Sequence, residues 1–232
     1  MSASLSTLLL ATGNPGKLVE LRARLANASV QVIGLDDLPE RPEEVPETGD
    51  TFEANAILKA VGYGQVAGLP TLADDSGLAV DALDGAPGVY SARFSGEGAT
   101  NATNNALLLD KLADLPAAQR GAHFHCTIAL WLPHSHPATT SLRATADRAG
   151  LKVHEGQGGV LILTEGQAHG RILTTLTGVG GFGYDPLFLS DDLGVTFAQA
   201  SAEEKLKVSH RGRALDALEP VWQAMRQGED EK

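Results

Sequence analysis

The chain has 232 residues, 43% of them hydrophobic, so it is long and apolar enough to bury the core of one domain with two lobes. Its formal net charge of −11 argues against binding along a nucleic acid, which needs many Lys and Arg contacts to phosphates. Residues 1–6 carry no basic side chain and lead into a short apolar run. We therefore expect neither a signal peptide nor a membrane span, and a cytoplasmic location.

The first half of the chain alternates strand-like apolar runs with helical periodicity. A run at 8–12 stops at a glycine-containing turn, and leucines then recur at helical spacing. Residues 50–53 have the spacing of a capping box before strong helix formers, which places Asn55 and Lys59 on one helical face. This half is predicted to contain strands at 8–12 and 30–34, an acidic loop at 36–50, a helix at 54–66, strands at 71–74 and 78–81 flanking an Asp75-Ser76-Gly77 turn, and a turn at 84–88.

The second half is expected to be mainly antiparallel sheet followed by helices. Its pattern predicts a helix at 99–115, strands at 124–132, 138–146, 158–164 and 171–176, and a helix from Ser201 that is interrupted near Gly212 and resumes over 214–227. No repeat or low-complexity linker separates the halves. The fold class is therefore mixed α/β, one domain over 1–232 with flexible ends at 1–6 and 228–232.

The loop from Thr12 to Lys17 follows a strand and opens a helix. Glycines in such a loop let backbone N–H groups approach a phosphate, the helix dipole favours an anion, and Lys17 adds a positive charge. The spacing is not that of a P-loop, because only Asn14 and Pro15 separate Gly13 from Gly16-Lys17. The alternative is a tight strand-to-helix turn with a solvated lysine.

Two adjacent carboxylates, Asp74 and Asp75, stand at the end of a predicted strand, where α/β proteins place ligands. Neighbouring strand residues point to opposite faces, so we expect Asp75 to face the ligand and Asp74 to support the turn or the outer shell of a metal. Magnesium uses one or two carboxylates together with phosphate oxygens and waters, and Glu47 is a second candidate ligand. The alternative is a simple Asp-Ser turn.

Two later segments carry candidate binding groups. Residues 180–186 combine glycines with aromatic rings, a composition that can present backbone donors and a ring face to a flat base, although a packed glycine turn is the alternative. Positive charge is dense over 205–213, where His210 and Arg211 lie at a predicted helix break. They are candidates for binding a polar ligand, and a solvated basic face is the alternative.

The remaining histidines and the cysteine give weaker signals. The pairs His123 with His125 and His134 with His136 have no matching ligand set, so no transition-metal site is predicted there. Cys126 is the only cysteine and lies in a strand-like run, so we expect a buried, inert thiol.

Several short motifs follow one another in a specific order. They are Ala11-Thr12-Gly13-Asn14-Pro15-Gly16-Lys17, Glu47-Thr48-Gly49, Asn55-Ala56-Ile57-Leu58-Lys59-Ala60, Ala73-Asp74-Asp75-Ser76-Gly77-Leu78, Gly85-Ala86-Pro87-Gly88-Val89-Tyr90-Ser91-Ala92-Arg93, Gly181-Phe182-Gly183-Tyr184-Asp185-Pro186 and Ser209-His210-Arg211-Gly212. In this order the set resembles the inosine triphosphate pyrophosphatase family, also called the Ham1 family. The resemblance runs from about Leu8 to about Leu218.

The resemblance implies an elongated two-lobed mixed-sheet fold with a cleft between the lobes, a homodimer, and a requirement for Mg²⁺. Glu47 and Asp75 would hold the metal, and Asp75 would also be the general base that activates water. The implied substrate-binding residues are Thr12, Gly13, Asn14, Pro15, Gly16 and Lys17 around the triphosphate, Lys59 on a phosphate, and Ser76, Phe182, Gly183, Tyr184, Asp185, Lys205, His210 and Arg211, with His210 and Arg211 near the base.

The implied activity is hydrolysis of non-standard purine nucleoside triphosphates (ITP, dITP and XTP) to the monophosphate and pyrophosphate, which cleanses the nucleotide pool. Water would attack the α-phosphorus while Lys17, Lys59 and magnesium offset charge on the leaving group. Donors facing the 6-keto oxygen would reject adenine, because its amino group leaves those donors unpaired. Guanine shares the 6-keto group, so its exclusion must act through the 2-position.

The chain departs from the family pattern in two places. Ala54 stands where many relatives carry Glu, with Glu53 one place earlier. The stretch between Phe124 and Phe182 is also longer than usual, and we expect the extra residues around 134–158 to form a surface hairpin or flap.

Two other functions compete with this interpretation. A nucleotide sensor without hydrolytic activity has little need for both Glu47 and Asp75. A Maf-like nucleotide pyrophosphatase with another base preference is disfavoured by the Ser209-His210-Arg211 segment.

Overall fold

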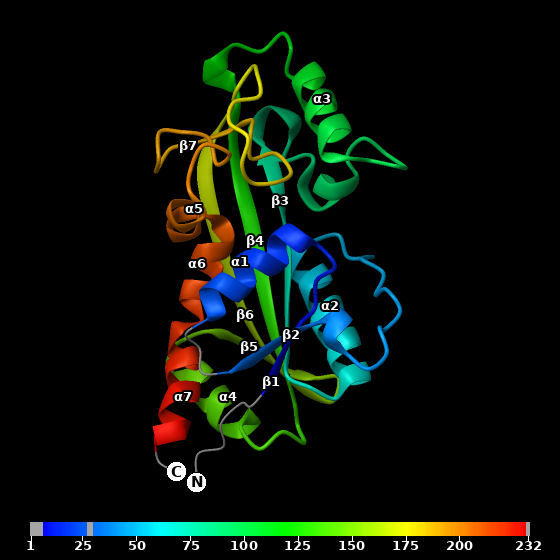
Figure 1. Ribbon diagram of the computed structural model, residues 1–232, viewed down its shortest axis with the longest axis vertical. Helices are drawn as coiled ribbons and strands as arrows, with labels where there is room; N and C mark the ends of the chain where they lie inside the picture. Colours follow the sequence, from blue (N-terminus) through cyan, green and yellow to red (C-terminus); the bar gives the residue numbers. More distant parts are fainter. Residues whose placement is uncertain (1–6, 27–29, 231–232) are drawn as a thin grey trace. The chain divides into compact units, whose positions relative to one another are not determined.

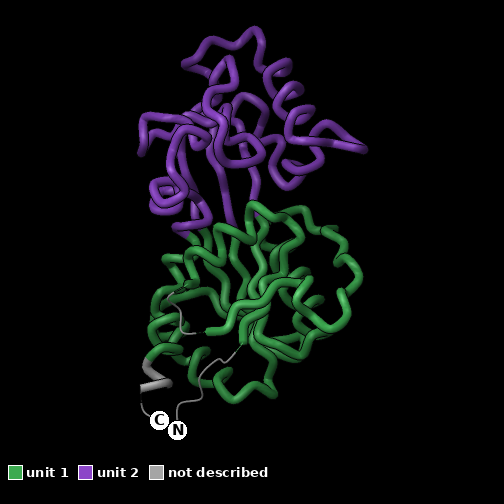
Figure 2. Tube along the Cα trace, viewed as in Figure 1, with its two compact units in different colours: residues 1–75, 127–165, 214–232 green, residues 76–126, 166–213 purple. Residues whose placement is uncertain are grey.

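The computed structural model describes residues 7–26 and 30–230, and the chain divides into two compact units (Figure 2). Unit 1 comprises Met1–Asp75, Thr127–Glu165 and Ala214–Lys232, and unit 2 comprises Ser76–Cys126 and Gly166–Arg213. Three of the four divisions fall within long strands, which are β3 (Thr71–Val80), β4 (Gly121–Pro133) and β6 (Gly159–Ile172), and the fourth falls within helix α6 (His210–Ala217). Each of these strands therefore contributes residues to both units.

Unit 1 is built on a parallel arrangement at its N-terminal end. Strand β1 (Thr7–Leu10) pairs in parallel with both β2 (Gln31–Gly34) and β3. Leu8, Leu9 and Leu10 are fully buried, as expected for a strand covered on both faces. Helix α1 (Pro15–Leu25) follows β1, and α2 (Phe52–Ala67) precedes β3.

Helix α2 packs on the sheet of unit 1. Its residues Ala56, Ala60, Val61 and Tyr63 share one core cluster with side chains from four strands. Those strand residues are Leu9, Ala73, Ala129, Trp131, Leu161 and Leu163. The packing fixes the face of α2 that looks toward β3, on which Asn55 and Lys59 are also buried.

The segment at 134–158 forms a helix and a strand, and the prediction of a strand at 138–146 was wrong. Helix α4 (Thr139–Arg148) buries Leu142 and Ala146 one turn apart and packs against α7 (Glu219–Asp230), as Figure 1 shows. Strand β5 (Lys152–Gly156) pairs antiparallel with β6. The threonines of this segment gave it strand character, but the buried i, i+4 pair favours the helix in its tertiary setting. The expected surface hairpin is confirmed by the largely exposed β5, which pairs with β6 across the turn at 157–158, whereas α4 was not expected.

Unit 2 surrounds a second core, rich in aromatic rings. The Phe124 ring lies 4.8 Å from that of Phe188 and 5.9 Å from that of Phe197, centroid to centroid. Helix α3 (Asn101–Lys111) is capped by Thr100 and adds Leu108 to this core. The unit also contains β7 (Phe188–Ser190), antiparallel to β6, the helix α5 (Ala202–Val208) and the 3₁₀ helices 81–83, 88–93 and 117–119.

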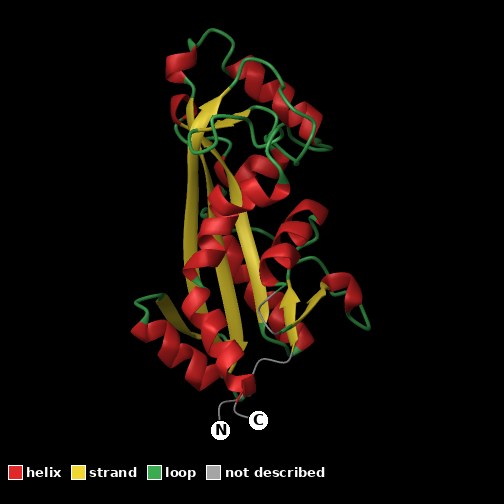
Figure 3. Cartoon of the chain, turned by 60° about the vertical axis from the view of Figure 1, so that its left-hand side comes forward, coloured by secondary structure: helices red, strands yellow, loops and turns green. Residues whose placement is uncertain are grey.

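The strand order in the sheet is β2-β1-β3-β4-β6-β5, with β7 paired to β6. Figure 3 shows the strands in yellow and the helices in red. The sheet contains parallel and antiparallel pairs, so the predicted mixed α/β class is confirmed. Cys126 is buried, as predicted. The cleft between lobes stays a prediction.

Strand β3 runs without interruption through the segment predicted as a turn at Asp75-Ser76-Gly77, so that prediction was wrong. The turn chemistry of Asp, Ser and Gly is outweighed here because strand pairing and core packing bury nine of the ten residues of β3. Asp74 and Asp75 can stay inside a strand because each has a lysine partner.

The C-terminal helices also differ from the prediction. The first break lies at Ser209 rather than near Gly212, and α6 (His210–Ala217) starts directly after it. Helix α7 includes residues 228–230, whereas the rest of the expected flexible ends, 1–6 and 231–232, lies outside the described residues. Over the described ranges, no helix combines the length and apolarity needed to cross a membrane.

Candidate active site

The loop before α1 places its polar groups around Asn14. The Oδ1 atom of Asn14 accepts hydrogen bonds from the backbone N–H groups of Gly16 at 2.9 Å and Lys17 at 3.2 Å. The Thr12 hydroxyl accepts from the Asn14 N–H at 3.2 Å. Asn14 thus caps the helix, and Pro15 occupies the first turn, where its missing donor costs nothing. A phosphate bound to the N–H groups of Gly16 and Lys17 has to replace this cap.

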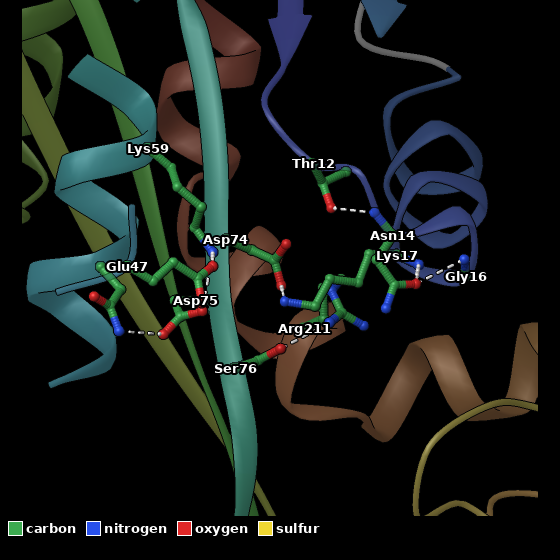
Figure 4. A network of polar contacts seen from close by, with 11 residues as sticks. Thr12, Asn14, Gly16, Lys17, Glu47, Lys59, Asp74, Asp75, Ser76 and Arg211 are labelled. Carbon is green, nitrogen blue, oxygen red and sulfur yellow. Dashed lines mark hydrogen bonds and ion pairs between the residues drawn. The ribbon is translucent and has the colours of Figure 1, made fainter. Parts of the chain in front are cut away.

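Lys17 lies in the first turn of α1 and reaches β3. Its Nζ is 3.1 Å from Asp74 Oδ2, and the Asp74 side chain is fully buried (Figure 4). Asp74 therefore holds the lysine of the glycine loop. The sequence pattern, in which Asp74 and Asp75 are adjacent, did not predict this ion pair.

Lys59 connects two carboxylates from different segments. Its Nζ donates to Glu47 Oε1 at 2.7 Å and to Asp75 Oδ1 at 2.9 Å. Figure 4 shows Lys17 and Lys59 reaching the two successive aspartates of β3. The side chains of Lys59 and Asp75 are 10% and 8% exposed, so this ion pair lies in a region of reduced dielectric.

Asn55 supports the same carboxylate from the preceding turn of α2. Its Nδ2 donates to Asp75 Oδ2 at 3.3 Å, and its Oδ1 accepts from the Gly49 N–H at 2.8 Å. A Cβ on residue 49 would lie 2.8 Å from that Oδ1, so only glycine allows this approach. Asn55 was not among the predicted site residues, although its four-residue spacing from Lys59 indicated it.

Burial and charge act in opposite directions on this cluster. Burial raises the pKa of the Asp75 carboxyl, and Lys59 and Lys17 oppose that shift. Burial lowers the pKa of Lys59, but Asp75, Asp74 and Glu47 outweigh it and hold that pKa above its usual range. Lys59 is therefore charged at neutral pH, and Asp75 is a stronger base than an exposed aspartate.

The residues present fit a magnesium ion. Glu47 and Asp75 provide hard carboxylate oxygens, and both already converge on one positive charge, the Lys59 ammonium. Within the described ranges, no group of three or more His, Cys, Asp or Glu side chains is arranged to hold a metal. Any ion at this pair therefore needs ligands from water or substrate.

In unit 2, Lys205 joins α5 to the loop at 182–185. Its Nζ donates to Asp185 Oδ2 at 2.6 Å and lies 4.7 Å from the centroid of the Phe182 ring. The same Asp185 oxygen accepts from the Phe182 N–H at 2.8 Å. Residue 181 has φ +70°, and a Cβ there would collide with the Asp185 carboxylate, so glycine is required.

The residues at the start of α6 are buried in unit 2. Arg211 Nη2 donates to Ser76 Oγ at 2.9 Å, and its guanidinium carbon lies 5.9 Å from the centroid of the Phe182 ring. The His210 ring stacks on Phe124 with centroids 4.7 Å apart and planes at 12°. Phe124 and the aromatic cluster behind it were not predicted as site residues.

The structure thus gathers most of the predicted residues into one polar network in each unit. Unit 1 joins Lys17, Glu47, Lys59, Asp74 and Asp75. Unit 2 joins Phe182, Asp185 and Lys205, and it pairs Ser76 with Arg211. Tyr184 is 4% exposed and donates its hydroxyl to Ser91 O at 2.9 Å, so it supports the loop from inside.

Comparison with known proteins identifies the relatives of this chain. The model of the Ham1 family matches residues 8–221. A dITP/XTP pyrophosphatase of Geobacter sulfurreducens is 46% identical over 223 residues, which cover 95% of this chain and 100% of that protein. One of Streptomyces avermitilis is 44% identical, covering 94% of this chain and 97% of the relative. The Staphylococcus aureus Ham1 protein has a similar structure, with a TM-score of 0.73, 35% identity, and coverage of 97% of this chain and all of that chain.

Proposed function

Because the chain belongs to the Ham1 family, we propose that it is a nucleoside triphosphate pyrophosphatase that hydrolyses dITP, ITP and XTP to the monophosphate and pyrophosphate. The observation that carries the proposal is the buried Lys59 ammonium held by both Glu47 and Asp75. The candidate base Asp75 and the candidate metal ligand Glu47 are each within hydrogen-bonding distance of Lys59, the candidate phosphate-binding cation.

Asp75 acts as the general base for the attacking water. Its Oδ1 is held by Lys59 and its Oδ2 by Asn55, so the carboxylate is fixed in orientation. Burial strengthens it as a base, and a base whose pKa approaches the working pH transfers protons more efficiently.

The two lysines neutralise the phosphates. Lys17 and Lys59 carry positive charge toward successive residues of β3, and both are held by carboxylates before substrate binds. Charge developing on the pyrophosphate leaving group is then met by groups that need little rearrangement. Thr12 and the capped loop that follows it contact the same triphosphate.

Magnesium is the proposed cofactor. Glu47 and Asp75 would hold it, and the bound ion would neutralise charge on the phosphate oxygens. Asp74 serves to hold Lys17, which keeps a second positive charge close to Asp75.

The residues of unit 2 bind the base. Lys205, Arg211 and the Phe182 ring lie together, and a ring face beside fixed donors suits a flat purine with a 6-keto oxygen. Adenine offers an amino group at that position and would leave the donors unpaired. The proposal extends to a homodimer in the cytoplasm, with neither nucleic acid nor membrane as a partner.

The test is an assay with ITP, XTP, ATP, GTP, dTTP and UTP in which pyrophosphate and orthophosphate are measured separately. We expect pyrophosphate release confined largely to ITP and XTP, lost in chelator and restored by Mg²⁺. Asp75→Asn is expected to lose this activity, while the exposed Asp147→Asn serves as the matched control and keeps it. Preference for dTTP or UTP would indicate a Maf-like enzyme, orthophosphate release would overturn the cleavage site, and no turnover would indicate a sensor.

A further inference from the structure

Asn105 in helix α3 contacts the loop at 182–185 from a buried position. The residue is 6% exposed, and its Nδ2 donates to the carbonyl oxygen of Gly183 at 3.0 Å. Its Oδ1 is buried without a hydrogen-bond partner among the described residues. Burying a polar amide costs desolvation free energy, which a leucine side chain at the same position would not cost. The favourable contribution of the amide at this position is therefore its hydrogen bond to Gly183.

The loop that receives this bond has little regular structure of its own. Gly181 and Gly183 have φ values of +70° and +61°, which few other residues adopt. Inside the loop, Asp185 Oδ2 accepts from the Phe182 N–H, and the Asp185 N–H donates to Phe182 O at 3.2 Å. These bonds hold the two ends of the loop, whereas the carbonyl of Gly183 lies between them and is held from outside by Asn105.

The neighbouring Asn104 has a different task. Its Oδ1 accepts from the Ser95 N–H at 2.8 Å, and its Nδ2 donates to Ser91 O and Ala92 O. It therefore ties α3 to the segment at 91–95. Although both asparagines are buried on the same helix, only Asn105 bonds directly to the loop at 182–185.

We propose that Asn105 is a positioning residue for nucleotide binding, which sets the Gly183 peptide and through it the place of Phe182 and Asp185. The inference rests on the proposed function, since it assigns this loop to the base. Fixing the loop before substrate arrives lowers the entropic cost of binding, so Asn105 acts on affinity rather than on the chemical step.

The experiment compares Asn105→Leu with the matched variant Asn104→Leu. For Asn105→Leu we expect about tenfold faster hydrogen exchange of the amides at 181–186 and about a tenfold higher KM for XTP, with kcat changed less than about twofold, as for loss of one hydrogen bond. For Asn104→Leu we expect the larger fall in melting temperature and a KM that rises less than in Asn105→Leu. It removes three bonds, none of them made to the loop itself, and Ser91 O keeps its bond from the Tyr184 hydroxyl.

A wild-type measurement keeps the proposal testable if a variant does not fold. The side-chain amide protons of Asn105 should be protected from exchange in NMR spectra of the free protein. Unprotected protons, an unchanged KM in Asn105→Leu, or equal loop exchange in both variants would overturn the proposal. If the wild type hydrolyses no nucleotide, the proposed function fails, while the exchange measurements still decide whether Asn105 holds the loop.

Discussion

Lys59 Nζ donates to Asp75 Oδ1 at 2.9 Å, and both side chains are largely withdrawn from water. The lysine comes from α2 and the aspartate from β3, so the bond joins the helix to the strand that it covers. Because Glu47 shares the same ammonium, removing the lysine leaves two carboxylates facing each other.

Lys59→Met is expected to destabilise the protein by about 3 kcal/mol, because an uncompensated buried charge remains. The matched control is Lys152→Met, which removes an ion pair to Glu53 whose lysine is 53% exposed, and the expected loss is below about 1 kcal/mol. Urea denaturation of both variants measures the difference. Equal losses would contradict a buried role for Lys59.

The stability of the metal-free protein should depend on the ionisation of Asp75. Burial raises the pKa of this carboxyl in the folded state, so its contribution is present below the unfolded value of about 4 and is lost as the pH rises through the folded value. Asp75→Asn cannot ionise. In chelator, its free energy of unfolding should therefore rise relative to wild type between about pH 4 and pH 7. If the free energy of unfolding of Asp75→Asn relative to wild type stays constant or falls over this range, the pKa of Asp75 is not raised in the folded state.

Gly181 and Gly183, which lie next to and in the loop at 182–185, respectively, should respond differently to substitution by alanine. At Gly183, where φ is +61° and a Cβ meets no atom within 4 Å, alanine adds only backbone strain of about 1 kcal/mol. At Gly181 the Cβ would also collide with the Asp185 carboxylate. Thermal denaturation should show the larger loss for Gly181→Ala, together with a higher KM for XTP. Equal losses of melting temperature in the two variants would contradict a steric clash between a Cβ at residue 181 and the Asp185 carboxylate.

Two lysines of α5 offer a matched pair for base recognition. Lys205→Met removes a buried partner of Asp185 and Phe182, so the KM for XTP should rise about tenfold or more. Lys207 is 68% exposed and pairs with Glu203, so Lys207→Met should leave the KM unchanged. Steady-state kinetics with XTP separates the two. A similar KM for both variants would exclude Lys205 from the binding site.

Local chemistry made several elements readable from the sequence. Asn14 and Pro15 favour the start of α1 by themselves, because a capping side chain and a proline act within one helical turn. For α2 the cap lies one residue later than the capping box predicted over 50–53, because the Thr51 hydroxyl accepts from the Ala54 N–H. The 3.6-residue period still places Asn55 and Lys59 on one face whatever the helix packs against. The family motifs depend on the same short-range order, so the sequence alone indicates the fold class and the family.

Only the tertiary structure determines which side chains form hydrogen bonds and ion pairs with one another. A turn was predicted from Asp75 to Gly77 because nothing nearby in the chain offers these carboxylates a cation. In the fold Lys17 and Lys59 reach Asp74 and Asp75 from two helices. Asn105 and Gly183 are 78 residues apart, and no periodicity relates them. Hydrogen bonds and ion pairs across such separations depend on how strands and helices pack, and the sequence pattern carries only the preference of each segment by itself.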